Sequence, residues 1–480
     1  MLGNNLNNSS GSAIRKGFIW SFVENISLQV SRFVIGIIMA RLLTPTDYGL
    51  IGMLTVFIVI SDLFVNSGIG AALNQKVNRT TADYSTAFYF NIVIGIFCYV
   101  ILYFAAPFIS SFYHEAQLTE LLRWLSMTIV IKSMCVVPST ILQINMRFKA
   151  ISIVALLSSL ALGISGIIFA TNGYGVWALV YSNLIGALFS LICYIGISKW
   201  MPKFLFSILS LKSLFGYGCK LLFATLTEVI YNNIYPLIIG RVYSAQELGY
   251  YSRAQGYANL PTGTLSSMIY RVCFPAFCKD KQDKTLLERN YNILMGATSY
   301  IIIPVMMLLL ILARPLVIIL ITDKWLPCVV FLQILCLSTM WLPIMEVNYS
   351  IIKALGNSKA ILRMQLLSKI FATIVLVITT RYGVEIMCIG SVVVSLFNLF
   401  INFILSRKQL SLSILQQFNP IIIPIIGGIC MLPSLFILNI GDNIYLHLLF
   451  TLCVAVTSYI IVTSLMGLSL KKIIINIKNL

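Results

Sequence analysis

The sequence predicts an all-α membrane protein with 14 transmembrane helices. Two six-helix lobes of the same orientation are expected around a central cavity, followed by two further helices. The 480 residues are 59% hydrophobic and 10% charged, with a mean hydropathy of +0.94. Apolar runs of about 20 residues, enough to span a bilayer, recur along nearly the whole chain. Basic residues lie in alternate connections between these runs, which indicates a repeatedly crossing chain.

The first helix is expected to follow a polar start, residues 1–14. Arg15 and Lys16 precede an apolar run that is too long for the core of a signal peptide, so this helix should remain in the mature protein. The expected spans are 17–43, 47–69, 84–112, 118–145, 152–171, 174–198, 214–240, 250–275, 291–321, 328–353, 361–380, 384–406, 419–439 and 444–466. Their connections are too short to hold a soluble catalytic domain.

The basic residues divide the connections into two sets. One set holds 21 of the 33 Lys and Arg residues, namely Arg15, Lys16, Lys76, Arg79, Arg147, Lys149, Lys199, Lys203, Lys212, Lys279, Lys281, Lys284, Arg289, Lys353, Lys359, Arg363, Arg407, Lys408, Lys471, Lys472 and Lys478. The alternate set is Arg41, Arg241, Lys324 and Arg381. The positive-inside rule places the larger set and both chain ends in the cytoplasm. The net charge of +18 is thus explained by topology, and no nucleic-acid partner is expected.

A stretch near the start of the chain recurs at an offset of 200. Residues 38–50 read IMARLLTPTDYGL, and residues 238–250 read IIGRVYSAQELGY. The matched positions are Ile38 with Ile238, Arg41 with Arg241, Thr44 with Ser244, Asp47 with Glu247 and Gly49 with Gly249. A duplicated bundle of membrane helices is typical of secondary transporters. The repeated loop itself is expected to cap the following helices through Asp47 and Glu247.

The duplication predicts the domain organisation. Helices 1–6 and 7–12 each begin and end on the cytoplasmic side, so the two lobes should be related by an axis along the membrane normal. We expect the first lobe at 1–198 and the second at 199–406. Helices 13 and 14 and a cytoplasmic tail should occupy 407–480.

Polar residues on the first helix suggest a lined cavity. Glu24, Asn25, Gln29 and Arg32 fall on one side of the helix at about 100° per residue. A charge within a bilayer costs about 2.5–3.5 kcal/mol on the insertion scale, so such groups usually face a cavity or a partner. We expect Arg32 to face a cavity; the alternative is a structural pairing with a neighbouring helix.

Other charges within predicted spans extend this pattern. They are Asp62, Lys132, Lys220, Glu228, Arg253, Arg271 and Glu346. Some lie near helix ends, where a charge often only anchors the span. The excess of deep cations over anions nevertheless predicts an anionic substrate group, and the planar donors of Arg suit phosphate.

Cysteine and histidine give no sign of a metal or redox centre. The eleven Cys residues occur singly, without a CxxC motif, and the two His residues are His114 and His447, far apart in sequence. Reduced, packed thiols are expected. No cofactor is therefore predicted, while coupling to protons, Na⁺ or the membrane potential stays open.

The run ENISLQVSRFVIGIIMARLLTPTDYGLIGMLTVFIVISDLFVNSGIGAALNQK, residues 24–76, resembles the start of Wzx-type polysaccharide flippases. These belong to the polysaccharide transporter family of the multidrug/oligosaccharidyl-lipid/polysaccharide (MOP) exporter superfamily. The likeness continues through YSTAFYFNI at 84–92, GYGVWALV at 173–180, IYRVCFPAF at 269–277 and KWLPCVVFLQIL at 324–335.

The resemblance implies a function. Such proteins are thought to move undecaprenyl-pyrophosphate-linked oligosaccharide from the inner to the outer leaflet of the bacterial inner membrane by alternating access, for export of O-antigen of lipopolysaccharide, capsule or exopolysaccharide. Membrane lipids, the polysaccharide polymerase and the chain-length machinery are the partners that it suggests. The implied substrate contacts are Arg32, Lys132, Lys220, Arg253, Arg271, Asn25 and Gln29. The implied ion-coupling residues are Glu24, Asp62, Glu228 and Glu346.

Two other classes of protein are weighed against a flippase. A drug/cation antiporter of the same superfamily would bind cations through acidic groups, which the basic interior disfavours. A membrane-embedded glycan polymerase or acyltransferase would gather acid, base or nucleophilic groups at the membrane surface. The predicted outer loops are short and hold one histidine, His114, so a transporter rather than an enzyme is expected.

Overall fold

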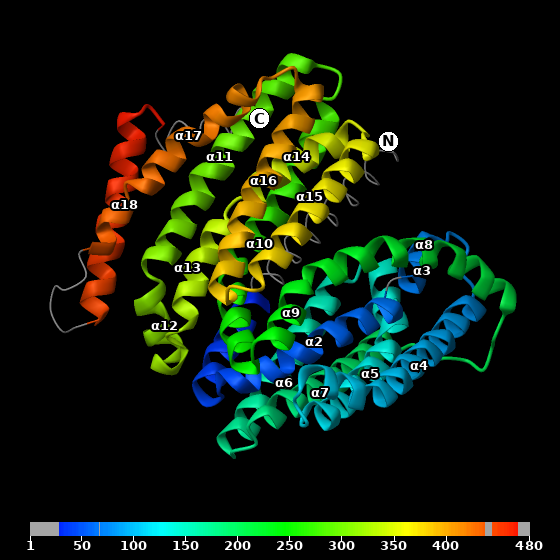
Figure 1. Cartoon of the computed structure of the whole chain (residues 1–480). Helices are drawn as coiled ribbons and strands as arrows, with labels where there is room; N and C mark the ends of the chain where they lie inside the picture. The colour runs from blue at the N-terminus through cyan, green and yellow to red at the C-terminus, as the bar shows by residue number, and fades with distance from the viewer. Residues whose placement is uncertain (1–27, 67, 437–443, 469–480) are drawn as a thin grey trace. The chain divides into compact units, whose positions relative to one another are not determined.

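The computed structural model describes residues 28–66, 68–436 and 444–468, and these residues form helices and no strand (Figure 1). Side chains are described for all of them except 213–221, 223–224 and 358. Contacts divide the chain into two compact units, Met1–Gly249 and Tyr250–Leu480. Each unit is considered by itself below.

The first unit begins with a helix described over residues 28–42. It continues with α2 (Pro45–Asn66), α3 (Ile69–Gln75), α4 (Thr81–Tyr113), α5 (Leu118–Ile144), α6 (Phe148–Thr171), α7 (Val176–Ser198), α8 (Ile208–Asn232), α9 (Ile234–Val242) and the first turn of α10 (Ala245–Lys279). The second unit holds the rest of α10, then α11 (Lys284–Ile311), α12 (Ala313–Ile321), α13 (Cys328–Thr339), α14 (Leu342–Ala354), α15 (Ser358–Thr379), α16 (Val384–Leu410), α17 (Ile414–Ile429) and α18 (Ile444–Leu465). Short 3₁₀ turns lie at Asp323–Trp325 and Leu432–Phe436.

The prediction of a polytopic helical protein is confirmed. Within the described residues, 11 helical segments are long and apolar enough to cross a membrane. Two further expected spans, 214–240 and 250–275, correspond to α8–α9 and α10 but do not meet that measure. The first expected span, 17–43, lies partly outside the described residues. The count of 14, the lobe boundaries and the orientation of the chain ends remain predictions.

Several expected spans are interrupted rather than continuous. The span expected at 214–240 breaks at Asn233, between α8 and α9. The span expected at 291–321 breaks at Leu312, between α11 and α12. Hydrophobic periodicity cannot show such breaks because the apolar pattern runs through them. At the first break the Val229 carbonyl accepts from both the Asn233 backbone N–H at 3.3 Å and Asn233 Nδ2 at 2.8 Å.

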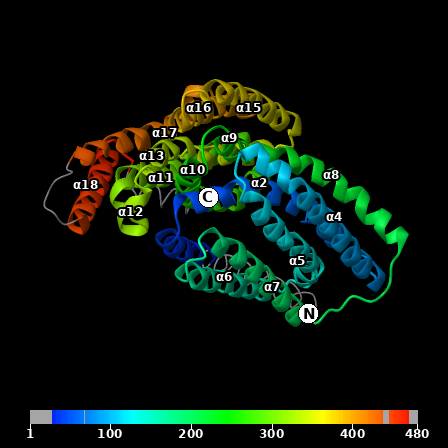
Figure 2. The same cartoon turned by 60° about the horizontal axis from the view of Figure 1, so that its bottom comes forward.

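The first unit packs through small residues. Its main helix pairs are α4 with α5 and α6 with α7, and α5 also packs on α7 (Figure 2). A Cβ added to Gly95 of α4 would lie 2.7 Å from Ser133 Oγ of α5, and one added to Gly163 of α6 would lie 2.4 Å from the Ile35 side chain. Such small residues let membrane helices approach closely, where dispersion rather than water exclusion holds them together.

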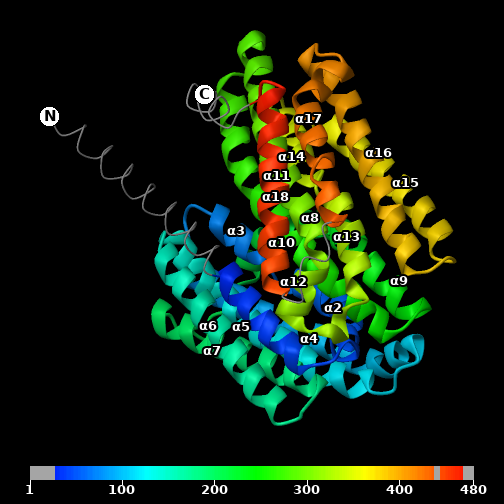
Figure 3. The ribbon, with the colours of Figure 1, turned by 90° about the vertical axis from the view of Figure 1, so that its left-hand side faces the viewer.

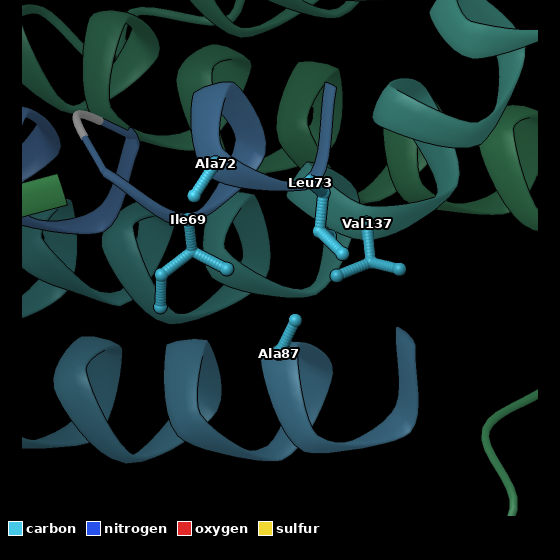
Figure 4. Packing of buried hydrophobic residues seen from close by; sticks show 5 residues of the cluster. All are labelled: Ile69, Ala72, Leu73, Ala87 and Val137. Carbon is cyan, nitrogen blue, oxygen red and sulfur yellow. The ribbon is translucent and has the colours of Figure 1, made fainter. Parts of the chain in front are cut away.

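A compact apolar cluster fixes α3 between α4 and α5. Ile69, Ala72 and Leu73 of α3 pack with Ala87 of α4 and Val137 of α5 (Figure 4). All five side chains are buried. This cluster holds the end of the span Pro45–Gln75 against the ends of its neighbours.

The two copies of the repeat meet in the first unit. A Cβ added to Gly49 would lie 1.6 Å from Ala245 O, and one added to Gly249 would lie 1.9 Å from Pro45 O. The first turns of α2 and α10 therefore cross in reciprocal backbone contact that only glycine allows at these two positions.

Capping in the repeated loop follows the prediction for the first copy. Asp47 Oδ2 accepts from the Thr44 backbone N–H at 2.8 Å and from its hydroxyl at 2.7 Å. In the second copy the Ser244 hydroxyl accepts from the Glu247 backbone N–H at 3.1 Å. The matched polar positions are thus structural, and they hold the two helix starts that cross.

The second unit is built on α16. It packs against α13 and α15, while α11 packs against α17 (Figure 3). The rings of Phe371 and Phe397 stack with centroids 3.8 Å apart between α15 and α16. Gly390 of α16 lies against α15, because a Cβ there would be 3.0 Å from both Val375 and Thr379. Helix α14 packs against α11 and α16, so polar residues of α11, α14, α16 and α17 come together.

Candidate functional site

The clearest charged site of the first unit is an ion pair between α2 and α5. Lys132 Nζ lies 2.5 Å from Asp62 Oδ2. The other carboxylate oxygen, Asp62 Oδ1, is buried and has no hydrogen-bond partner among the described residues. The Lys132 side chain is 43% exposed and that of Asp62 is 21% exposed. The pair is therefore partly exposed through Lys132, while Asp62 Oδ1 is buried.

The pair lies midway along two spans. Lys132 is about 20 Å from either end of α5, and Asp62 is a similar distance from the ends of the segment Pro45–Gln75, at 1.5 Å per residue. Here each charge would be costly alone, and pairing offsets that cost. The family resemblance implied a coupling role for Asp62 and a substrate contact for Lys132, and both roles stay predictions. The structure places the two side chains in one ion pair.

Arg32 is placed on the exposed side of the helix at 28–42. An adjoining side packs on α6 through Ser31, whose Oγ is 3.4 Å from Ser159 Oγ, and through Ile35 against Gly163. Arg32 is exposed and forms no ion pair with any other residue that the structure describes. The alternative of a structural pairing with a described residue is thus not observed. Gln29 is half-buried.

Two predicted residues of the first helix, Glu24 and Asn25, lie outside the described residues. On α8, Lys220 is placed in the helix but its side chain is not described. Glu228 follows two turns later on α8 and is exposed, without an ion pair to another described residue. The contrast expected between the first and seventh helices stays a prediction.

In the second unit the predicted cations are far apart. Arg253 and Arg271 lie on the same helix, α10, about 27 Å apart along its axis. Arg253 lies over the Trp325 ring at 5.8 Å, whereas Arg271 is exposed. The two guanidiniums therefore cannot bind one pyrophosphate together. Glu346 is half-buried on α14, about two helical turns before Lys353. The Nζ of Lys353 lies 4.6 Å from the Tyr270 ring centroid.

The sequence analysis missed a neutral polar network in the second unit. The Tyr291 hydroxyl of α11 donates to Asn348 Oδ1 of α14 at 2.9 Å and lies 3.3 Å from Gln417 Oε1 of α17. The Ser406 hydroxyl of α16 donates to the same Gln417 oxygen at 2.7 Å. All four side chains are fully buried. Polar residues in otherwise apolar helices were the available signal, but sequence cannot show that they converge.

Beside this network, α11 and α17 enclose a cavity of about 450 Å³. Its lining residues are Asn292, Ile293, Gly296, Ala297, Leu412, Gln416, Asn419, Pro420, Ile423 and Leu468. The lining carries side-chain amides and no charged group, so it offers no cation to a phosphate.

The described residues contain no group of three or more His, Cys, Asp or Glu side chains that could hold a metal ion. The described cysteines are free thiols. The expectation of a chain without a cofactor stays a prediction.

Comparison with known proteins gives matches to polysaccharide biosynthesis proteins. A family model described as polysaccharide biosynthesis protein matches residues 38–330. The teichuronic acid biosynthesis protein TuaB of Bacillus subtilis (strain 168) is 25% identical over 349 residues, which are 72% of this chain and 72% of that protein. The lipopolysaccharide biosynthesis protein WzxC of Escherichia coli (strain K12) is 23% identical over 326 residues, 67% of this chain and 65% of that protein.

The fold also has a solved counterpart. A structure of the lipid II flippase MurJ superimposes with a TM-score of 0.75, at 16% sequence identity, over 94% of this chain and 98% of that chain. This likeness concerns the fold. The sequence matches concern the family, and the matched segment includes Asp62 and Lys132.

Proposed function

This chain belongs to the family of polysaccharide biosynthesis proteins, as a Wzx-type flippase of the MOP exporter superfamily, and we propose that its substrate is undecaprenyl-pyrophosphate-linked oligosaccharide. In this proposal the protein carries the lipid-linked glycan from the inner to the outer leaflet by alternating access. The exported polymer would be O-antigen, capsule or exopolysaccharide.

One observation carries the proposal: cationic groups lie within the spans, and one cation is held by a carboxylate that a phosphate could replace. Lys132 is neutralised by Asp62 and is still 43% exposed. A pyrophosphate oxygen approaching Lys132 Nζ would compete with Asp62 Oδ2 for the same donor. The pyrophosphate diester carries two negative charges in all, so Lys132 can form a charge-assisted hydrogen bond with it where water is scarce, provided that the charge released on Asp62 is compensated.

The exchange would make Asp62 a binding site for a coupling cation. Once Lys132 turns to the pyrophosphate, Asp62 is left as a carboxylate inside the span, and an uncompensated charge there is costly. Binding of a proton or Na⁺ by Asp62 would remove that cost. Arg32 supplies a second cation with no carboxylate partner among the described residues, so it can contact phosphate without any exchange.

A cellular experiment tests the proposal. Deleting the gene should leave lipid-linked repeat units on the inner leaflet, with normal synthesis of those units and no surface polymer. Restoring wild-type protein should restore the polymer, while Lys132→Ala protein at equal membrane abundance should not. Failure to synthesise the lipid-linked unit in the deletion strain would instead indicate an enzyme. Normal surface polymer after deletion would contradict the proposal.

A further inference from the structure

The connection between α7 and α8, whose course can be followed in Figures 1 and 2, is unusual in its composition and exposure together with the first turn of α8. Residues 199–212 read KWMPKFLFSILSLK and contain three lysines and no acidic residue. Its exposed apolar side chains are Met201, Phe204, Leu205, Phe206, Ile208 and Leu209. Phe204 is 98% exposed and Leu209 is 82% exposed. Lys199, Lys203 and Lys212 are exposed as well.

The segment is fixed to α4 by its backbone. The Lys203 N–H donates to Ser85 Oγ at 3.1 Å, and the Ser207 N–H donates to Thr86 Oγ1 at 3.0 Å. Both hydroxyl residues are buried in the first turns of α4. The polar backbone of the segment thus faces the protein, which leaves its apolar side chains on the outside.

An aromatic anchor secures the same surface. The Trp200 ring packs edge-on against Phe88 at 5.6 Å and Tyr84 at 6.5 Å. The Phe204 ring lies nearly parallel to that of Tyr89, with centroids 6.2 Å apart, and remains 98% exposed. The exposed apolar groups are therefore held in position by the structure rather than on a loose loop.

The segment lies where two spans end. It follows directly on α7, which ends at Ser198, and it crosses the first turns of α4, which begins at Thr81. Span ends lie at the boundary between acyl chains and headgroups, where aromatic and aliphatic side chains enter the lipid and lysines reach the phosphates. Asp83, in the first turn of α4, is already paired with Lys76 at 2.7 Å. The cations of the segment are thus not neutralised by it.

We propose that residues 199–212 form a docking surface for the anionic membrane surface. Met201, Phe204 and Leu209 enter the acyl boundary, and the three lysines contact the phosphate groups of anionic lipids. The lipid is held because positive charge and exposed apolar area coincide on one fixed segment. This inference does not depend on the substrate of the protein.

Membrane depth is the first test. The full-length protein is placed in vesicles of phosphatidylethanolamine and phosphatidylglycerol, with a spin label on a ketone-bearing phenylalanine analogue at position 204. Oxygen, which concentrates in lipid, should reach the label better than a water-soluble nickel chelate. The same label at Lys281, in the exposed connection between α10 and α11, should show the reverse order. Preferential access of the nickel chelate at position 204 would overturn the proposal, and so would shielding from both reagents, which indicates a protein partner.

Lipid selectivity is the second test. Native mass spectrometry should show more phosphatidylglycerol than phosphatidylcholine retained on the wild-type chain. Replacing Lys199, Lys203 and Lys212 by Gln should reduce retained phosphatidylglycerol several-fold. The matched control replaces Lys279, Lys281 and Lys284 by Gln, which removes the same charge from a connection without the apolar cluster, and should change little. Equal losses in both variants, or no loss in the first, would contradict a specific anionic surface.

Discussion

The ion pair of the first unit and the amide network of the second unit place polar groups in membrane helices in opposite ways. Asp62 and Lys132 are charged, partly exposed and about 20 Å or more from the ends of their candidate membrane spans. Tyr291, Asn348 and Gln417 are neutral, fully buried and within about 10 Å of their helix ends. The pair leaves a carboxylate oxygen unbonded, whereas the network uses the same Gln417 oxygen twice.

This difference separates a group that can exchange partners from one that holds helices together. A network shared among four helices cannot release one member without stranding another, so it favours a single arrangement. A pair with one exposed side can trade its carboxylate for a ligand anion. The first unit therefore carries the candidate site, and the second unit carries a polar clamp. Five predictions test this division.

The largest loss in the free energy of unfolding should come from a steric change alone, and the losses of the polar variants are compared with it. Gly49→Ala places a Cβ 1.6 Å from the backbone oxygen of Ala245, which has no flexible end to move. We expect a loss of at least about 3 kcal/mol in the free energy of unfolding. Gly256→Ala is the matched control, because a Cβ there meets nothing within 4 Å. Equal stability of the two variants in thermal unfolding would contradict the backbone crossing.

Lys132→Ala should reduce flipping about 100-fold, equivalent to about 2.7 kcal/mol at the usual conversion. It should also lower the free energy of unfolding by about 1–3 kcal/mol, because Asp62 is left without its partner. The double variant Asp62→Asn, Lys132→Met should recover stability but not flipping. Recovery of both would make the pair structural and remove the distinction between the two regions.

Gln417→Leu should lower stability but leave the flipping rate unchanged, unlike Lys132→Ala, which should lower both. It removes the amide oxygen that accepts from the Tyr291 and Ser406 hydroxyls. It also removes the Nε2 group that donates to the Phe403 and Leu412 carbonyls, and we expect the free energy of unfolding to fall by about 2 kcal/mol. Flipping per folded molecule should stay near the wild-type rate. A rate loss as large as that of Lys132→Ala, measured on protein of equal folded fraction, would assign function to the network as well.

Arg32→Ala should reduce flipping about tenfold with little change in stability, because Arg32 is exposed and unpaired among the described residues. Arg32→Lys keeps the charge and should retain most of the rate. A stability loss without a rate loss would indicate a structural role instead.

The smallest effect should come from Asp283, which caps α11 by accepting from Thr285 and Leu286. The Thr285 hydroxyl and these backbone donors lower the pKa of Asp283 below its usual value. Its stabilisation is therefore present above the pKa of the unfolded chain and is lost as pH falls through the lower folded value. Asp283→Asn should lower Tm by about 1 °C at neutral pH and less in acid. If the difference in Tm between wild type and Asp283→Asn were the same at all pH values, the charge of Asp283 would not be the cause of the stabilisation.

Much of the helical architecture follows from sequence because a bilayer demands long apolar segments. The repeat also predicted the capping by Asp47. It did not predict that Gly49 and Gly249 meet backbone reciprocally, because a matched residue type carries no information on distance. The breaks at Asn233 and Leu312 were missed for a similar reason, since the apolar pattern continues across them.

The candidate site was predicted as residues but not as an arrangement. Asp62 and Lys132 stood out as charges in apolar runs, 70 positions apart in the chain. Their pairing depends on how α2 packs against α5, which composition does not determine. Gln417 was missed because it lies two residues before the expected span 419–439, where an amide normally faces water. Convergence of four helices is what buries it.

The central claim is most directly tested by the leaflet distribution of labelled undecaprenyl-pyrophosphate oligosaccharide in vesicles that contain the purified protein. We expect wild-type protein to expose inner-leaflet substrate to an outside reagent, while empty vesicles and vesicles with Lys132→Ala protein keep it protected. Equal protection with and without wild-type protein would contradict the account.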